Sequence, residues 1–193
     1  MSGRGSQRRL VVVLAAASLL VSGACSGGTG EDSASAVGGT ATSSTAAPAG
    51  GRTVSWDVAL TSAQRIIRQV GPASTLNYGW NELVGPTTVD GAPAQVQMLG
   101  NVDYENGTGP FFGFVTLEFA TGDVLALRMD GQATQSPGAQ GSADSSFRAE
   151  LTVIGGSGAY VGATGGRGTF TGSRSAELGG QVTGSMTVTV AGL

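Results

Sequence analysis

The sequence predicts an all-β protein whose folded part is one antiparallel, closed barrel of roughly eight strands, placed after a signal peptide and a disordered tether. From Gln95 onward, short β-branched and aromatic runs are separated by Gly, Asn, Asp and Pro, which is typical of strands joined by tight turns. Apolar and polar residues alternate in the clearest runs, as expected of an antiparallel sheet between a core and water. The 34 glycines suit the turns and bulges by which a small barrel curves.

The first 24 residues have the three-part order of a secretory signal peptide. A stretch with three arginines and no acidic residue precedes an apolar run, Leu10–Val21, and then three small residues, Ser22-Gly23-Ala24. The apolar run is shorter than the roughly 20 residues that span a bilayer as a helix, so we expect no permanent transmembrane anchor. Arg8-Arg9 partly matches a twin-arginine export signal, but Gln7 replaces the usual Ser or Thr, so the choice between Sec and Tat export stays open.

The chain's single cysteine, Cys25, directly follows these small residues. A lone cysteine can be a reactive thiol, half of an intermolecular disulfide or a packing residue, but none of these roles explains its position. The run Val21-Ser22-Gly23-Ala24-Cys25 resembles the lipobox of bacterial lipoproteins, although Ser22 stands where leucine is usual. The resemblance implies that Cys25 carries diacylglycerol and palmitate chains, and two or more such chains give stable anchoring. We therefore expect a lipoprotein on the extracytoplasmic face of a bacterial cell membrane, with an ordinary cleaved signal and a secreted protein as the alternative.

A tether is predicted between Cys25 and the barrel. Ser26–Gly51 consists mostly of Gly, Ser, Thr and Ala, with one acidic pair and no aromatic residue. Such a segment buries too little apolar area to offset the entropy of ordering it, and a flexible coil of this length spans about 25–30 Å. The predicted organisation is therefore residues 1–24 as signal peptide, 25–51 as lipidated cysteine and tether, and 52–193 as the barrel domain.

Charge and composition exclude several classes of function. Loss of the signal leaves seven basic side chains against 13 acidic ones, a net charge of about −6, which argues against nucleic-acid binding. The sequence has no histidine or lysine, and acylation of Cys25 leaves no free thiol. These absences exclude Ser–His and Cys–His nucleophiles, Schiff-base lysines, and imidazole or thiolate metal sites, so we expect neither a metal nor a cofactor.

The barrel strands are expected in eight runs, and Ser62–Val70 fits either a short amphipathic helix or a further strand. In Phe147–Ile154 and Gln181–Val190 the alternation of apolar and polar residues is clearest. The expected strands are Val54–Leu60, Leu76–Val84, Gln95–Tyr104, Phe111–Ala120, Val124–Ala133, Phe147–Ile154, Gly168–Arg174 and Gln181–Val190. Turn signals between them are Glu105-Asn106-Gly107, Thr121-Gly122-Asp123 and Ser136–Ser145.

Two stretches of the barrel domain carry a resemblance to a known superfamily. Asn101–Leu117 reads NVDYENGTGPFFGFVTL, and Leu151–Gly165 reads LTVIGGSGAYVGATG. Together they resemble the allene oxide cyclase and dirigent barrels, whose members share a strand ending in a GGTG-aromatic-x-G-A-x-G turn. From Gln95 to the C-terminus, the resemblance implies an eight-stranded antiparallel barrel, an apolar central cavity and a homo-oligomer, since plant members are frequently trimers. Ser55–Val58 lacks the histidine of the plant aromatic-His-Asp motif, so no catalytic residue is carried over.

The glycine-rich segment around this turn is interpreted as structural. Its spacing is not that of a dinucleotide-binding fingerprint, and no Walker lysine is present, so a phosphate-cradling loop is disfavoured. The predicted structural turn comprises Gly155, Gly156, Gly158, Gly162 and Gly165.

A candidate cavity wall lies on the second expected strand, where Tyr78, Trp80 and Glu82 alternate onto one face. A carboxylate buried on an aromatic face is costly, so it should be paired, protonated or functional. If this face lines a cavity, Glu82 is a general acid or ligand anchor and the two aromatic rings are the wall. If the strand end is exposed, Glu82 simply meets water.

The strand Phe111–Ala120 poses the same question, because Glu118 shares a face with Phe112 and Phe114. Its opposite face is also apolar, which predicts burial on both sides, the outer side by another subunit or by the N-terminal segment. Core packing is an alternative account of the phenylalanines.

Three functions remain open. The barrel could bind a small apolar ligand or an envelope partner without catalysis, act as a cyclase or isomerase on an apolar substrate using Glu82 or Glu118, or serve as a structural envelope protein with a packed barrel. The first is favoured because the anchor and tether suit capture at a surface and because few side chains in the sequence support catalysis. The choice depends on whether the barrel contains a cavity.

Overall fold

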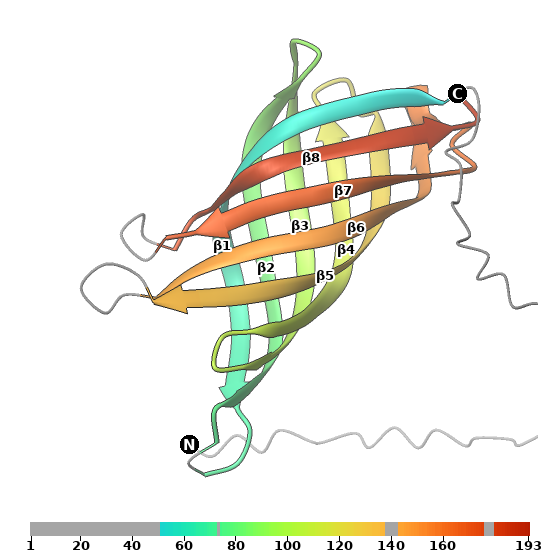
Figure 1. Cartoon of the computed structure of the whole chain (residues 1–193). Coiled ribbons are helices and arrows are strands. Elements are labelled where there is room, and N and C mark those ends of the chain that lie inside the picture. Colours follow the sequence, from blue (N-terminus) through green and yellow to red (C-terminus); the bar gives the residue numbers. More distant parts are fainter. Residues whose placement is uncertain (1–50, 73, 138–142, 176–179) are drawn as a thin grey trace, which may run out of the picture. The chain divides into compact units, whose positions relative to one another are not determined.

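The computed structural model describes residues 51–72, 74–137, 143–175 and 180–193, so the predicted signal peptide, Cys25 and nearly all of the tether lie outside the described residues. Eight strands form one closed barrel, and each pairs antiparallel with its neighbours in the order β1 to β8, which confirms the predicted fold class (Figure 1). The strands are β1 Arg52–Gln69, β2 Leu76–Val89, β3 Ala92–Glu105, β4 Gly109–Phe119, β5 Val124–Pro137, β6 Ala143–Ser157, β7 Gly165–Arg174 and β8 Val182–Ala191.

Strand β1 closes the barrel by pairing with a different neighbour along each half. Its first half pairs with β8, from Arg52 opposite Val190 onward, and its second half pairs with β2 up to Gln69 opposite Asn77. The segment that fits either a helix or a strand in the sequence, Ser62–Val70, therefore continues β1 as a strand up to Gln69. A register shift between Ser62 and Gln64 marks a bulge, which breaks the two-residue alternation that identifies a strand from sequence.

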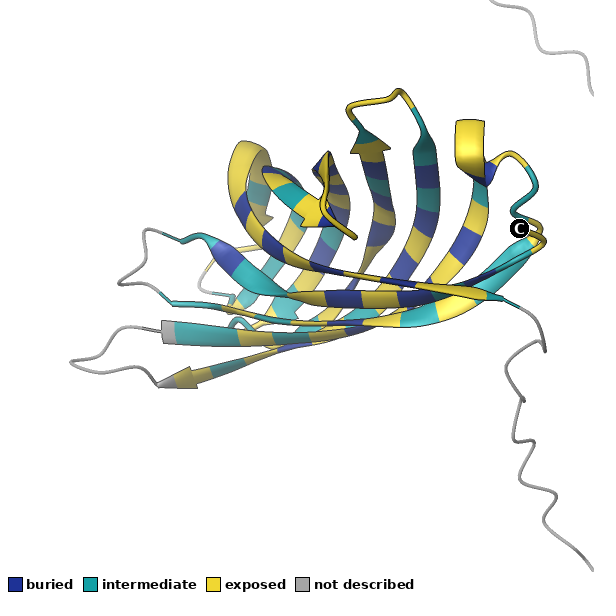
Figure 2. Ribbon diagram, turned by 90° about the horizontal axis from the view of Figure 1, so that it is seen from above, coloured by how far each residue is buried: buried dark blue, intermediate teal, exposed yellow. Residues whose placement is uncertain are grey.

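Side chains alternate between the core and solvent along the strands, seen in Figure 2 as bands of dark blue and yellow. The alternation predicted for β6 and β8 is confirmed: Leu151 and Val153 are buried between exposed residues, and Met186, Val188 and Val190 fill the core from β8. The interior is thus an apolar core built from every second residue, as expected for a small antiparallel barrel.

One end of the barrel is filled by side chains. Between β6 and β7, the short 3-10 helix η2, Gly158–Tyr160, places Tyr160 in the core, where its ring stacks on Phe119 at 5.6 Å between centroids. Asp123 fastens η2 to the β4–β5 turn, because its Oδ1 accepts a hydrogen bond from the Ala159 amide at 2.9 Å. This end is therefore closed.

The glycine-rich segment forms the chain path around η2. Gly155 and Gly156 belong to the end of β6, and Gly165 begins β7. Gly158 has a φ of 60°, and a Cβ there would collide with the carboxylate of Asp123, so this position requires glycine. The arrangement accounts for the segment in structural terms.

Candidate functional site

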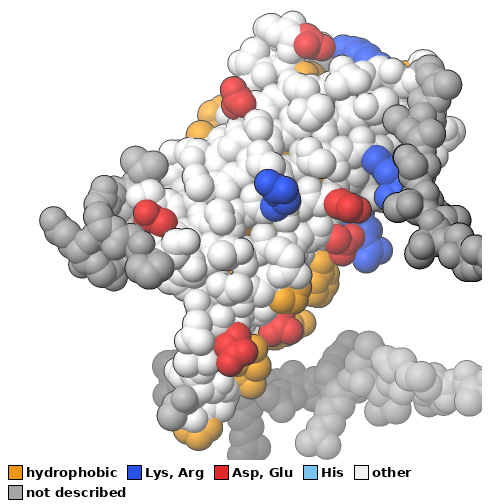
Figure 3. All heavy atoms as spheres, viewed as in Figure 1, with side chains coloured by type: hydrophobic (Ala, Val, Ile, Leu, Met, Phe, Trp, Pro, Cys, Tyr) orange, Lys and Arg blue, Asp and Glu red, His pale blue; other side chains and the backbone are white. Residues whose placement is uncertain are grey.

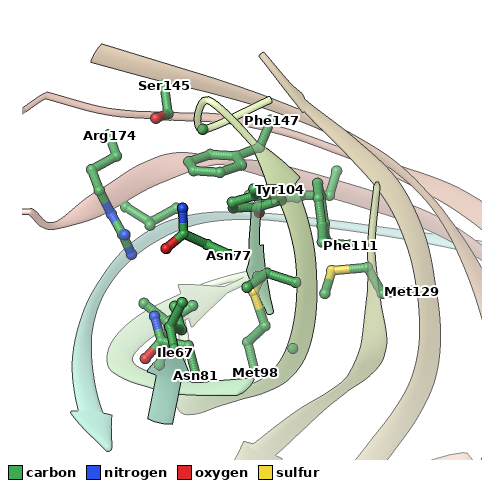
Figure 4. Close-up of a pocket in the computed structure, with 16 residues that line it drawn as sticks. Ile67, Asn77, Asn81, Met98, Tyr104, Phe111, Met129, Ser145, Phe147 and Arg174 are labelled. Carbon is green, nitrogen blue, oxygen red and sulfur yellow. The ribbon is translucent and has the colours of Figure 1, made fainter. Parts of the chain in front are cut away.

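A cavity of about 220 Å³ lies inside the barrel at the end opposite η2, and 16 residues line it (Figure 4). Its lining comes from all eight strands, from Met98 and Met129 at mid-strand to Arg174 at the end of β7, and from Gly107 in the β3–β4 turn. The cavity is partly open to solvent at the end opposite η2. The barrel is thus filled at one end and hollow at the other.

Most of the cavity wall is apolar. Met98, Met129 and Phe170 are buried at its base, and Phe111 and Phe147 form one side. The rings of Phe111 and Phe147 meet edge to face, with 5.9 Å between centroids and 85° between planes. Methionine side chains adapt their shape to neighbours, so this wall suits an apolar guest without demanding one rigid outline.

A few polar side chains interrupt the apolar wall: Asn77, Asn81, Tyr104, Ser145 and Arg174. Asn81 is only 5% exposed. Its Oδ1 accepts a hydrogen bond from the Ser62 hydroxyl at 2.9 Å, which fixes the amide in place. An apolar cavity with a few convergent polar groups is the usual composition of a small-molecule site.

Arg174, the last residue of β7, is the cation of this cavity. Its Nε is buried and has no hydrogen-bond partner among the described residues. Burial lowers the pKa of Arg174; Tyr104 acts in the opposite direction, and the nearby cation Arg65 lowers this pKa as well. Arginine nevertheless stays charged in proteins, so the cavity contains a positive charge.

Tyr104 lies beside this charge, on β3. Burial raises the pKa of Tyr104 to about 12, against the smaller opposing effect of Arg174. The phenol therefore keeps its proton at neutral pH and can both donate and accept a hydrogen bond. Arg174 and Tyr104 together make one side of the cavity polar.

The aromatic residues proposed from the sequence as cavity walls lie on the outer face of the barrel, which corrects that interpretation. Tyr78 is 51% exposed, Phe112 42% and Phe114 51%, and Trp80 is half-buried on the same outer face. Figure 3 shows hydrophobic side chains gathered beside acidic ones on part of the outer surface. None of these four residues lines the cavity. Burial of this outer face by a second subunit stays a prediction.

The two candidate carboxylates also point away from the cavity. Glu82 lies on the outer face of β2, where its Oε1 accepts a hydrogen bond from Gln97 Nε2 at 2.7 Å. Glu118 is exposed on β4. Neither carboxylate faces the cavity, so neither is placed to act on a substrate inside the barrel.

The opposite faces of β2 and β4 point inward, and on β2 the sequence pattern does not indicate this. On β2 the inner face carries Asn77, Gly79 and Asn81, which read as a solvent-facing pattern, while the outer face carries the aromatic rings. Arg174 is likewise absent from the site residues that the sequence predicts. The one available signal was that it shares a strand face with Phe170 and Gly172, because residues two apart point the same way.

Neither a cluster of metal-binding side chains nor a membrane-spanning helix is found in the described part of the chain. Among the residues described, no cluster of three or more His, Cys, Asp or Glu side chains could hold a metal ion. No helix within the same residues is both long and apolar enough to cross a bilayer.

The fold and cavity define the molecule as a small closed antiparallel barrel that is hollow at one end. Comparison of the chain with protein-family models, with curated proteins and with solved structures gives no match.

Proposed function

We propose that the barrel binds one small, mostly apolar molecule in its cavity and does so without catalysis. The observation that carries this proposal is a cavity of about 220 Å³ whose base is formed by buried methionine and phenylalanine side chains. Eight-stranded barrels are wide enough to hold one small ligand. Because drug-sized sites occupy roughly 300–1,000 Å³, the guest is a small molecule or the apolar end of a larger one.

Binding is favoured over catalysis by the composition of the lining. The 16 described residues around the cavity include no Asp or Glu, and the sequence contains no histidine or lysine. General acid–base catalysis usually depends on these side chains. The lining therefore suits recognition better than the cyclase or isomerase activity considered from the sequence.

The location proposed for this binding is the extracytoplasmic face of a bacterial membrane, through an acylated Cys25. Support comes from the order of charged, apolar and small residues before that cysteine and from the Gly/Ser/Thr/Ala composition of residues 26–51. A relationship to the allene oxide cyclase and dirigent barrels is proposed on the same footing, from the motifs in Asn101–Leu117 and Leu151–Gly165.

The cavity can be filled from Gly100, which lies in its lining with no atom nearer than 3.9 Å to an added Cβ. We expect Gly100→Val to weaken binding of 1-octanol at least tenfold, because the new methyl groups occupy the space the guest needs. Binding is measured by titration calorimetry on the full chain carrying Cys25→Ser, which carries no acyl chain. The matched control is Leu99→Ala on the exposed face of the same strand, which should leave the affinity unchanged.

Two results would contradict the proposal. The first is the absence of saturable, one-to-one binding to the unsubstituted barrel. The second is unchanged affinity in Gly100→Val when its melting temperature shows that the barrel is folded.

A further inference from the structure

We propose that the guest is a carboxylate-bearing amphiphile, with its carboxylate paired to Arg174 and its apolar chain among the methionine and phenylalanine side chains at the base of the cavity. This inference rests on the proposed function and adds the chemical class of the ligand. The observation behind it is a cation, partly buried in an otherwise apolar cavity, whose Nε has no partner among the described residues.

The position of Arg174 suits a charge at the open end. Arg174 ends β7 and stands opposite Ser145 near the start of β6, so its side chain enters the cavity close to the solvent. In Figure 4 the guanidinium reaches toward Asn77, on the side of the cavity away from Met129. A ligand whose charged group meets Arg174 can therefore place its apolar part deeper in the barrel.

The charge on Arg174 is not balanced by the ion pairs that the structure shows. The two ion pairs among the described residues join Arg52 to Asp90 and Arg128 to Asp130, both on exposed surface. The neighbouring cation Arg65 adds repulsion to the cost of burial. A partly buried cation whose Nε lacks a partner is unfavourable, and arginine cannot relieve this by losing its proton, so an anion that pairs with it is stabilised here.

A carboxylate fits this cation better than a phosphate does. The planar guanidinium presents parallel N–H donors that match two carboxylate oxygens, and one negative charge balances one positive charge. A phosphate monoester carries about −1.5 to −2 charges at pH 7 and would leave excess negative charge against an apolar wall. Tyr104, protonated because its pKa is about 12, adds a neutral O–H donor in the same lining.

The test compares three probes with the same eight-carbon chain: octanoate, 1-octanol and octyl phosphate. Titration calorimetry at pH 7.5 uses the full chain carrying Cys25→Ser. We expect one equivalent of octanoate to bind at least tenfold more tightly than 1-octanol, and more tightly than octyl phosphate. This comparison requires no substitution in the cavity.

The role of Arg174 is tested with Arg174→Met, which keeps a long side chain and removes the charge. We expect this variant to bind octanoate no better than 1-octanol. Saturable binding of 1-octanol by the same variant shows that its cavity is intact. Arg167→Met, at an exposed position of the same strand, is the matched control and should keep the full preference for octanoate. If Arg174→Met fails to bind 1-octanol, Arg174→Gln replaces it in the same comparison.

The outcomes separate this inference from the proposed function. Equal binding of octanoate and 1-octanol overturns the anion assignment and leaves the proposed function standing. Binding of none of the probes overturns both. Tighter binding of octyl phosphate overturns the choice of carboxylate, and a preference for octanoate that survives the loss of Arg174 overturns the role of that residue.

Discussion

At the scale of single residues, the cavity shows how burial changes the behaviour of a polar side chain. Tyr104 and Arg174 occupy the same lining, and burial makes the charged form of each less favourable. Tyr104 responds by keeping its proton to high pH, whereas Arg174 stays charged because its intrinsic basicity is too high to overcome. A neutral donor and a cation therefore lie side by side.

The raised pKa of Tyr104 has a consequence for stability in alkali. Its pKa is about 12 in the folded protein and about 10 in an unfolded chain, so between these values only the unfolded chain has released the proton. The stabilisation is fully present below pH 10 and is lost as the pH rises through 12. We expect a loss of about 1–2 kcal/mol, less than the full shift implies because the ring is only half-buried.

Urea unfolding of the parent and of Tyr104→Phe between pH 9 and pH 12 measures this loss. Tyr160, whose pKa burial also raises, remains in both proteins and therefore cancels in the difference. The free energy of unfolding should fall more steeply with pH in the parent. Parallel curves would show that Tyr104 does not supply the effect.

At the scale of elements, the closed end depends on one carboxylate that joins the β4–β5 turn to η2. Asp123 accepts hydrogen bonds from the Thr121 hydroxyl at 2.7 Å and from the Ala159 amide at 2.9 Å. These bonds, the hydroxyl first, hold the pKa of Asp123 below its ordinary value, and desolvation opposes them. Because the pKa of Asp123 is lower in the folded protein than in the unfolded chain, this carboxylate stabilises the fold at pH values above the unfolded-chain pKa. The stabilisation is lost as the pH falls through the folded-state pKa.

Replacement of the hydroxyl donor tests this connection. We expect Thr121→Val to raise the pKa of Asp123 toward its ordinary value, because the largest cause of the lowering is removed. Carboxyl-carbon NMR titration measures the pKa directly. Thr152→Val, at an exposed position on β6, serves as control, and equal Asp123 titrations in all three proteins would contradict the assignment.

The strands could be predicted from sequence more readily than the direction their side chains face. In β6 and β8, apolar and polar residues alternate, so each strand has one apolar and one polar face. This pattern predicts both the strand and the face that points into the core. On β2 the outer face is aromatic and the inner face contains asparagine and glycine, so hydrophobicity alone assigns the wrong side to the core. On β4 both faces are apolar, so hydrophobicity alone does not choose between them. Only strand pairing, which joins residues far apart in the chain, decides between the two faces.

The cavity was harder to predict than the barrel for the same physical reason. Alternation indicates which residues share a face, but a void depends on side-chain volumes contributed by many strands at one level. Gly100 helps leave this space open, and nothing in its local sequence distinguishes it from glycines in turns. Arg174, at a strand end, likewise reads as an ordinary solvated charge.

At the scale of the whole molecule, the barrel combines a filled end, which stabilises it, with a hollow end that leaves apolar surface available. A guest that binds only the folded state stabilises that state in proportion to the logarithm of its concentration. The cavity thus connects ligand binding to the unfolding of the entire barrel.

This connection predicts the size of the stabilisation. Octanoate at a free concentration of 100 times its Kd should raise the free energy of unfolding by about 2.7 kcal/mol, measured by urea unfolding at pH 7.5. At the same concentration, Arg174→Met should gain about 1.4 kcal/mol or less, because its Kd for octanoate is expected to be at least tenfold higher. Equal gains in the two proteins would indicate that octanoate acts elsewhere on the surface.

The closed end and the open end of the barrel lie at opposite ends of its axis, and this affects how the protein can be attached to other molecules. The chain enters β1 at Arg52, which pairs with Val190 beside the closed end, while the cavity opens at the far end. A carrier protein, a dye or a solid support joined ahead of Arg52 would thus be attached at the pole away from the opening. The barrel is consequently suited to immobilisation on a biosensor through its N-terminal side, with the entrance left free for analytes in solution.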